Sequence, residues 1–211
     1  MVGVAMSFDI DVTVRLGEAV VGAVVPDDGR NSGLTVLFGP SGVGKSSVLN
    51  MVAGLLRPAA GHVRVDGRTL FDSAAGIDIA VQGRCCGYVF QEPRLFPHRR
   101  VAANLRYGMG RGTPPIDYDD MIALLGLEHL LDRWPATLSG GEAKRVAIGR
   151  ALLSGARFLL MDEPLASLDR ARREEVMVAI ERLRDTLRLP ILYVTHDAAE
   201  AERLATRIVA M

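Results

Sequence analysis

The chain has 211 residues, of which 49% are hydrophobic, and its 25 basic and 25 acidic residues give a formal net charge of zero. That length is enough for one large or two modest domains with a sizeable core, and the neutral balance gives no global electrostatic case for nucleic acid or an anionic membrane surface. Because no apolar run is long enough to span a bilayer and no signal peptide is evident, we expect a cytosolic protein.

The first third of the chain predicts strands. Residues 8–14 alternate apolar and polar side chains, as a strand with one solvated face does, and the more apolar run 20–25 could pair with it. Residues 26–33 indicate a loop, and residues 61–67 indicate a short strand that ends in an Asp-Gly turn. The only cysteines, Cys85 and Cys86, are adjacent and are interpreted as core thiols.

A glycine-rich segment joins the apolar run 34–38 to the helix-like stretch 48–53. It fits the P-loop pattern G-x-x-x-x-G-K-[ST], in which main-chain N–H groups and a helix N-terminus face a phosphate chain. Lys45 would reach the β- and γ-phosphates, and the Ser46 hydroxyl is placed to bind Mg²⁺. The alternative is a glycine-rich loop with a chance lysine, against which the flanking strand and helix argue. The predicted nucleotide-binding residues here are Gly39, Pro40, Ser41, Gly42, Val43, Gly44, Lys45, Ser46 and Ser47.

The middle of the chain changes character. Prolines interrupt residues 92–135, and leucines between residues 121 and 131 recur at helical spacing, which predicts a small helical insert. Residues 138–142 then open a long helix that ends near Gly155.

The last third alternates apolar strands with helices. Strands are expected over residues 158–161 and 191–194 and from Arg207 to Met211, with helices over 170–188 and 199–205. This alternation predicts a mostly parallel sheet between helical layers, with ligands at the carboxyl ends of the strands.

Asp162 and Glu163 follow the strand 158–161 directly. At the carboxyl end of a buried strand, Asp162 can hold Mg²⁺ through its water shell opposite Ser46. Glu163 points elsewhere and is a candidate general base that polarises the attacking water. The alternative is an Asp-Glu pair that caps a strand-to-helix turn.

Residues 138–142, Leu-Ser-Gly-Gly-Glu, resemble the signature motif of the ABC ATPase family. The family's other motifs also occur in order along nearly the whole chain: the P-loop, Gln91, the signature, Asp162-Glu163, Ser167-Leu168-Asp169 and His196. The resemblance implies the P-loop NTPase fold of ABC ATPases, a three-layer α/β sandwich with a mostly parallel central sheet, an N-terminal antiparallel β subdomain and a small helical subdomain. Residues 1–211 would form one nucleotide-binding domain, with its core in 1–91 and 136–211 and the helical insert in 92–135.

The same resemblance implies a head-to-tail homodimer that buries two ATP molecules. The signature residues Ser139, Gly140, Gly141 and Glu142 of one subunit would close over the γ-phosphate bound at Lys45 of the other, where a helix N-terminus favours anions. It further implies that Gln91 links the nucleotide to the helical insert and touches Mg²⁺ or the attacking water, that Asp169 bridges the subunits, and that His196 contacts the γ-phosphate. Taken singly, Gln91 could be a surface residue, and His196 with Asp197 a polar pair at a helix N-terminus.

Residues 88–98, 104–109 and 165–169 look like those of the ATPase subunits of bacterial molybdate importers, although importers for sulfate, ferric iron or polyamines share much of this pattern. The resemblance implies an ATPase at the cytoplasmic face of the inner membrane, where permease subunits dock near Leu95, Phe96 and Pro97. One rival is a soluble ABC protein of the DNA-repair or ribosome-associated kind, which the absence of a coiled-coil insertion, a second cassette and a basic excess opposes. Another is a module that binds nucleotide without hydrolysis, which the presence of Glu163 and His196 opposes.

Three departures from the family pattern stand out. The signature ends in Glu142 where glutamine is usual, although molybdate-type members share the glutamate. No aromatic residue lies between Phe8 and Phe38 to stack on adenine, so stacking on the base would be weak or would be supplied by aliphatic residues, with reduced base selectivity as a consequence. The chain stops at Met211, so we expect no C-terminal oxyanion-binding regulatory domain in it.

Overall fold

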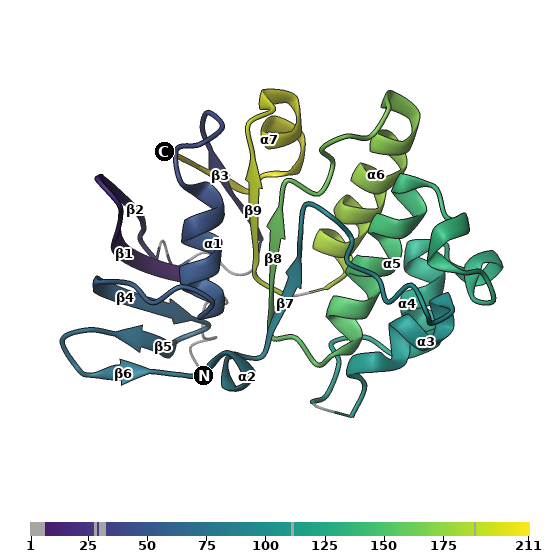
Figure 1. Cartoon of the computed structure of the whole chain (residues 1–211), viewed down its shortest axis with the longest axis horizontal. Helices are drawn as coiled ribbons and strands as arrows, with labels where there is room; N and C mark the ends of the chain where they lie inside the picture. The colour runs from purple at the N-terminus through teal and green to yellow at the C-terminus, as the bar shows by residue number, and fades with distance from the viewer. Residues whose placement is uncertain (1–6, 28, 30–32, 111, 188) are drawn as a thin grey trace.

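Two five-stranded sheets form the framework of the computed structural model, which describes residues 7–27, 29, 33–110, 112–187 and 189–211 (Figure 1). The first sheet is antiparallel and has the order β2-β1-β4-β5-β6. Its strands are β1 (Phe8–Leu16), β2 (Ala19–Val25), β4 (Ala60–Val65), β5 (Arg68–Asp72) and β6 (Ile77–Asp78). The alternation in residues 8–14 buries Phe8, Ile10, Val12 and Val14, as expected of a strand with one solvated face.

The second sheet is parallel throughout, with the order β10-β3-β9-β8-β7. Its strands are β3 (Leu34–Phe38), β7 (Cys86–Val89), β8 (Phe158–Asp162), β9 (Ile191–Thr195) and β10 (Arg207–Ala210). Phe38 pairs with Thr195 and Asp162 with Val194, so the carboxyl ends of β3, β9 and β8 lie side by side. The segments after these three strands are the P-loop, His196 and Glu163, and the sheet therefore brings them to one edge.

Helices cover both faces of the parallel sheet. Figure 1 shows α1 (Lys45–Ala53) between the two sheets, where its apolar side shares a core with β1 and β8. On the opposite face lie α5 (Gly140–Leu153) and α6 (Arg170–Thr186), and beyond them α3 (Val101–Leu105) and α4 (Tyr118–Leu125). The short helices α2 (Val81–Arg84) and α7 (Ala198–Leu204) complete the layers. The predicted three-layer α/β arrangement, with a parallel central sheet and an antiparallel β subdomain, is confirmed.

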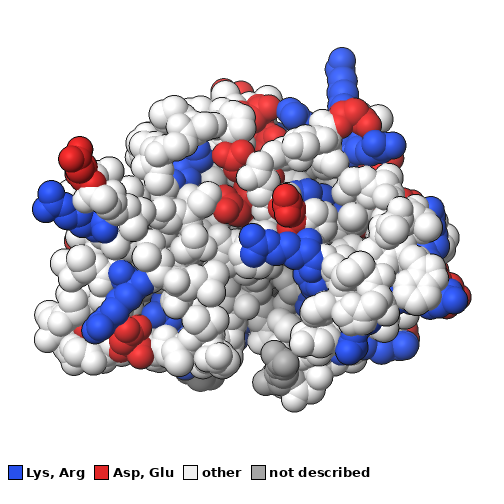
Figure 2. Space-filling view, in the orientation of Figure 1, with Lys and Arg blue, Asp and Glu red and all other residues white. Residues whose placement is uncertain are grey.

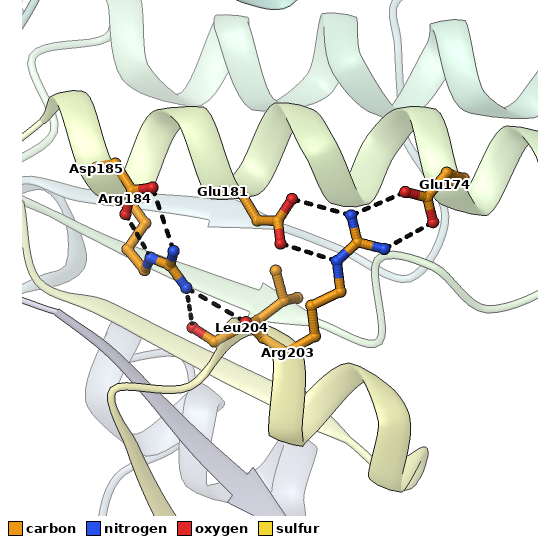
Figure 3. Close-up of polar contacts among 6 residues, drawn as sticks. All are labelled: Glu174, Glu181, Arg184, Asp185, Arg203 and Leu204. Atoms are coloured by element: carbon orange, nitrogen blue, oxygen red, sulfur yellow. Dashed lines mark hydrogen bonds and ion pairs between the residues drawn. The ribbon is translucent and has the colours of Figure 1, made fainter.

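An ion-pair cluster fixes α7 against α6 (Figure 3). The Arg203 guanidinium lies 2.7 Å from a Glu174 carboxylate oxygen and 2.8 Å from one of Glu181. Arg184 of α6 donates to the Leu204 carbonyl at 2.9 Å. These contacts bind the helix that follows His196 to the helix that follows Asp169.

Some local expectations differ from the structure. Cys85 is exposed at the end of α2, so its assignment as a core thiol is wrong. Cys86 is partly buried and packs against the core, and burial raises the pKa of the Cys86 thiol. Strands β5 and β6 and helix α2 were not expected. Residues 28 and 30–32 of the expected loop, and Arg188 of the expected helix 170–188, lie outside the described residues.

The surface agrees with the neutral composition. Figure 2 shows basic and acidic side chains interspersed over one face of the molecule, without one sign covering it. Within the part of the chain that the structure describes, no helix combines the length and apolar character needed to cross a bilayer.

Candidate functional site

The P-loop connects β3 to α1 by a turn that glycines permit. Gly42 and Gly44 adopt φ of 84° and 106°, in the left-handed region where a side chain is strained. A Cβ atom at Gly44 would also lie 2.3 Å from Val21 Cγ1 of β2, so the antiparallel sheet closes directly against the loop. Val21 is thus an aliphatic side chain next to the P-loop, and it belongs to the segment between Phe8 and Phe38 that contains no aromatic residue.

The ammonium of Lys45 lies inside this loop. It is 4% exposed and donates to the carbonyls of Gly39 and Pro40, both at 2.8 Å. It also lies 3.9 Å from Glu163 Oε1. A buried cation held by two carbonyls at a helix N-terminus makes the loop strongly attractive to an anion, since the helix dipole acts in the same direction.

Ser46 and Asp162 meet although 116 residues separate them in the sequence. The Ser46 hydroxyl donates to Asp162 Oδ1 at 2.8 Å. Burial raises the pKa of Asp162, and the neighbouring Glu163 charge adds to this effect, while hydrogen bonds from Ser46 and Tyr88 oppose it. The Tyr88 hydroxyl donates to Asn50 Oδ1 at 3.2 Å and lies 3.5 Å from Asp162 Oδ2.

This oxygen pair fits Mg²⁺. A hydroxyl and a carboxylate in contact are hard ligands of the kind that Mg²⁺ prefers, and the ion needs only one or two protein ligands beside nucleotide and water. Burial and the neighbouring Glu163 charge raise the pKa of Asp162, and a divalent cation at this carboxylate would oppose both effects. Within the described residues no cluster of three His, Cys, Asp or Glu side chains offers a metal site.

Glu163 adopts a backbone conformation that is unusual for a non-glycine residue, with φ of 41°. Its N–H donates to the Val194 carbonyl at 3.1 Å, which holds the residue against the end of β9. Its Oε1 lies 3.2 Å from Nδ1 of His196, which is half exposed. The structure thus brings together a carboxylate, an imidazole and the P-loop lysine.

A buried carboxylate supports the segment before His196. Glu200 is 4% exposed, and its Oε2 accepts hydrogen bonds from Tyr193 and Thr195, both at 2.8 Å. Asp197 caps α7 by accepting from the N–H of Ala199 at 2.9 Å, and Arg173 of α6 pairs with Asp197 at 2.9 Å. The turn that carries His196 is therefore fixed from two sides.

Gln91 lies where the two cavities of the site meet. A cavity of about 410 Å³ is lined by Gln91, Glu163 and the P-loop residues Ser41, Gly42, Gly44, Lys45, Ser46 and Ser47. A neighbouring cavity of about 590 Å³ is lined by Gln91, Asp162, Gly140 and Lys144, among others. Of the signature residues, only Gly140 contributes to either cavity, and only to the second.

The signature motif forms a capping box at the start of α5. The Ser139 hydroxyl accepts from the Glu142 N–H at 3.2 Å, and Glu142 Oε2 accepts from the Ser139 N–H at 2.6 Å. Burial acts against ionisation of Glu142, but hydrogen bonds from Ser139 and the nearby Arg133 lower the pKa of this carboxyl below its usual value. Glu142 is thus engaged at the start of its own helix by Ser139, and its Oε1 pairs with Arg133 at 3.4 Å.

Asp169 stands apart from the P-loop. It caps α6 by accepting from the Arg172 N–H at 2.9 Å, pairs with the Arg172 guanidinium at 3.2 Å, and is exposed. Within this subunit the structure brings the P-loop, Asp162, Glu163, His196 and Gln91 together, and it does not bring Asp169 or Ser139 to them.

Sequence reasoning missed several residues that shape the site. Tyr88, Asn50 and Glu200 form the hydrogen bonds described above, and Lys144 contacts Gln91. A polar residue within an apolar strand, as Tyr88 and Tyr193 are, was the one available signal, because a buried hydroxyl usually has a partner.

Comparison with known proteins gives consistent results. The family model described as ABC transporter matches residues 30–166. The molybdenum import ATP-binding protein ModC of Mesorhizobium japonicum is 53% identical over 97% of this chain and 55% of the relative, and that of Rhodospirillum rubrum is 57% identical over 84% and 49%. The chain thus spans about half the length of the curated relatives it matches.

Solved structures agree in fold. CbiO1 of Clostridium perfringens, part of an ABC transporter complex, superposes with a TM-score of 0.78 at 25% identity, covering 97% of this chain and 84% of that one. A dimeric ATP-binding cassette in a post-hydrolysis state bound to ADP and Pi gives a TM-score of 0.72 at 26% identity, covering 96% and 92%.

Proposed function

Because the chain belongs to the ABC transporter family, we propose that it is the ATP-hydrolysing subunit of an importer and that molybdate is the imported oxyanion. The observation that carries the hydrolytic function is the contact of Glu163 with His196 at 3.2 Å, beside Lys45 of the P-loop. The similarity to molybdenum import proteins at 49–57% identity supports the substrate. A sulfate, ferric iron or polyamine importer is the alternative substrate class, and a soluble ABC ATPase the alternative setting.

In this proposal the residues of one subunit divide the reaction among them. Lys45 and the P-loop N–H groups hold the phosphate chain. Glu163 accepts a proton from the attacking water while the oxygen of that water bonds to the γ-phosphorus. The bond from the γ-phosphorus to the bridging oxygen breaks, and ADP leaves with that electron pair. His196 orients Glu163 and contacts the γ-phosphate. Ser46, Asp162 and Gln91 would hold Mg²⁺, whose positive charge would stabilise the negative charge that develops on the phosphate oxygens.

The signature motif is proposed to act on a second copy of the chain. Ser139, Gly140 and Gly141 lie at a helix N-terminus and do not line the cavity formed by the P-loop of their own subunit, and a helix N-terminus favours an anion. In a head-to-tail homodimer they would close over ATP bound by the partner, and the exposed Asp169 would bridge the subunits. The dimeric cassette found among the solved structures supports this arrangement.

The helical part of residues 92–135 is proposed to receive integral-membrane permease subunits, which would place the protein at the cytoplasmic face of the inner membrane. Leu95 and Phe96 are partly buried and Pro97 is exposed. A neighbouring open cavity of about 580 Å³ is lined by Arg99, Arg106 and Tyr107, among others. In this proposal the chain is one nucleotide-binding domain, with its core in residues 1–91 and 136–211 and the helical insert in residues 92–135.

Phosphate release from Mg²⁺-ATP by the purified protein tests the proposal. We expect activity that rises faster than linearly with protein concentration, because each site needs a second subunit. Lys45→Ala is the matched control and should lose both nucleotide binding and hydrolysis. Unchanged ATP binding by Lys45→Ala, or no hydrolysis at any wild-type concentration, would contradict the proposed activity.

A further inference from the structure

The backbone that follows β7 is held to helix α5 by cationic side chains. The Lys144 ammonium donates to the Gln91 carbonyl. Six residues further along the same helix, Arg150 donates to the Pro93 carbonyl at 3.1 Å and to the Arg94 carbonyl at 2.8 Å. Three carbonyls between residues 91 and 94 are therefore bound by one helix, whose first turn carries the signature motif.

Lys144 occupies an unusual environment for a lysine. It is 3% exposed and lines the cavity of about 590 Å³ that Gln91 and Asp162 also line. Burial lowers the pKa of Lys144 to about 8, against the opposing effect of the carboxylates of Asp162 and Glu92. A buried ammonium is costly and is kept only where it has a partner, so the Gln91 carbonyl is a specific contact.

We propose that Lys144 is a positioning residue for ATP hydrolysis, which ties the main chain of Gln91 to helix α5 so that Gln91 and the signature motif move together. The inference rests on the proposed function, in which Gln91 reaches the nucleotide of its own subunit and the signature reaches that of the partner. Helix α5 would then link the geometry of the two ATP sites, because a shift of its first turn displaces Gln91 through Lys144.

The helix offers a matched control. Arg145 is the next residue and also binds carbonyls, those of Leu125 at 2.8 Å and Gly126 at 3.2 Å, but these belong to the C-terminal end of α4. Lys144→Met and Arg145→Met each remove one carbonyl-binding cation from α5, and only the first should release Gln91. Lys144→Arg keeps a cationic donor and should restore part of the lost activity.

The test is a double-mutant cycle with Gln91→Ala in the full chain. Losing a hydrogen bond to a charged donor should lower kcat of Lys144→Met about tenfold with KM for Mg²⁺-ATP changed less than about twofold. In the Gln91→Ala background, Lys144→Met should lower kcat no further, whereas any effect of Arg145→Met should be the same in both backgrounds. An equal effect of Lys144→Met in the two backgrounds would overturn the proposal.

A second measurement does not depend on hydrolysis. Amide hydrogen exchange of residues 91–97 should be faster in Lys144→Met than in wild type and unchanged in Arg145→Met, because of these two side chains Lys144 alone contacts the segment, and Arg150 keeps its contacts in both variants. Unaltered exchange in Lys144→Met would refute the tie even if the wild-type protein proved inactive. Inactivity of the wild type with the expected exchange would instead refute the proposed function and leave the tie standing.

Discussion

The hydroxyl of Tyr193 is expected to contribute to stability through the buried carboxylate of Glu200. Tyr193 is fully buried, and its hydroxyl donates to Glu200 Oε2 at 2.8 Å. Tyr193→Phe keeps the ring in the core and removes one of two hydroxyl donors to a carboxylate that is 4% exposed. A hydrogen bond to a buried charge contributes about 1.5–3 kcal/mol, so the free energy of unfolding should fall by about 2 kcal/mol.

Tyr118 supplies the control for this change, because its buried hydroxyl has no hydrogen-bond partner among the residues that the structure describes. Tyr118→Phe should leave stability unchanged or raise it by about 0.5–1 kcal/mol, since it removes an unsatisfied polar group. Urea unfolding at neutral pH, followed by circular dichroism, measures both variants. Equal losses in the two variants, or a loss below about 0.5 kcal/mol in Tyr193→Phe, would refute the reasoning.

Two further predictions concern charged contacts. Glu142→Gln keeps an acceptor for the Ser139 N–H but removes the negative charge. Because the folded-state pKa of Glu142 lies below its ordinary 4.5, the difference in unfolding free energy from wild type should be largest near neutral pH and should vanish as the pH falls through that lowered pKa. Unfolding midpoints of the two proteins that diverge on acidification would contradict this prediction. Arg203→Met should lower the thermal midpoint of unfolding, because it releases α7 from Glu174 and Glu181 of α6 (Figure 3). Arg182 is exposed on α6 and has no ion pair among the described residues, so Arg182→Met should leave the midpoint unchanged. Equal midpoints of the two variants would contradict a stabilising role of the ion-pair cluster.

Much of the fold could be predicted because its signals are local. The apolar run 158–161 indicated a buried parallel strand, and the Ser139 and Glu142 pair is a capping box that the sequence places at the start of α5. The P-loop pattern predicted the turn and a helix after it, although α1 begins at Lys45, before the expected stretch 48–53. Strands β5 and β6 were not predicted, because the two buried residues of β5 are adjacent and do not alternate with exposed ones, and β6 is a pair of exposed residues.

The supporting contacts of the site could not be predicted, because they join residues far apart in the chain. Lys144 contacts a carbonyl 53 residues away, and Tyr88 contacts Asn50 across 38 residues. A lysine or a tyrosine in the sequence does not indicate which distant group it contacts, and a single lysine on a helix is most often exposed to solvent. The wrong assignment of Cys85 has a similar cause: the chain turns through a left-handed residue there, which carries the side chain into solvent.

The central claim is that Glu163 is the general base of a site completed by a second subunit, and Glu163→Gln tests it most directly. The substitution removes the proton acceptor at 3.2 Å from His196 Nδ1 and leaves the P-loop intact. The variant should bind ATP with wild-type affinity, release no phosphate, and sediment as a dimer in the presence of ATP. Hydrolysis at the wild-type rate, or an inactive variant that binds ATP but stays monomeric, would contradict the account.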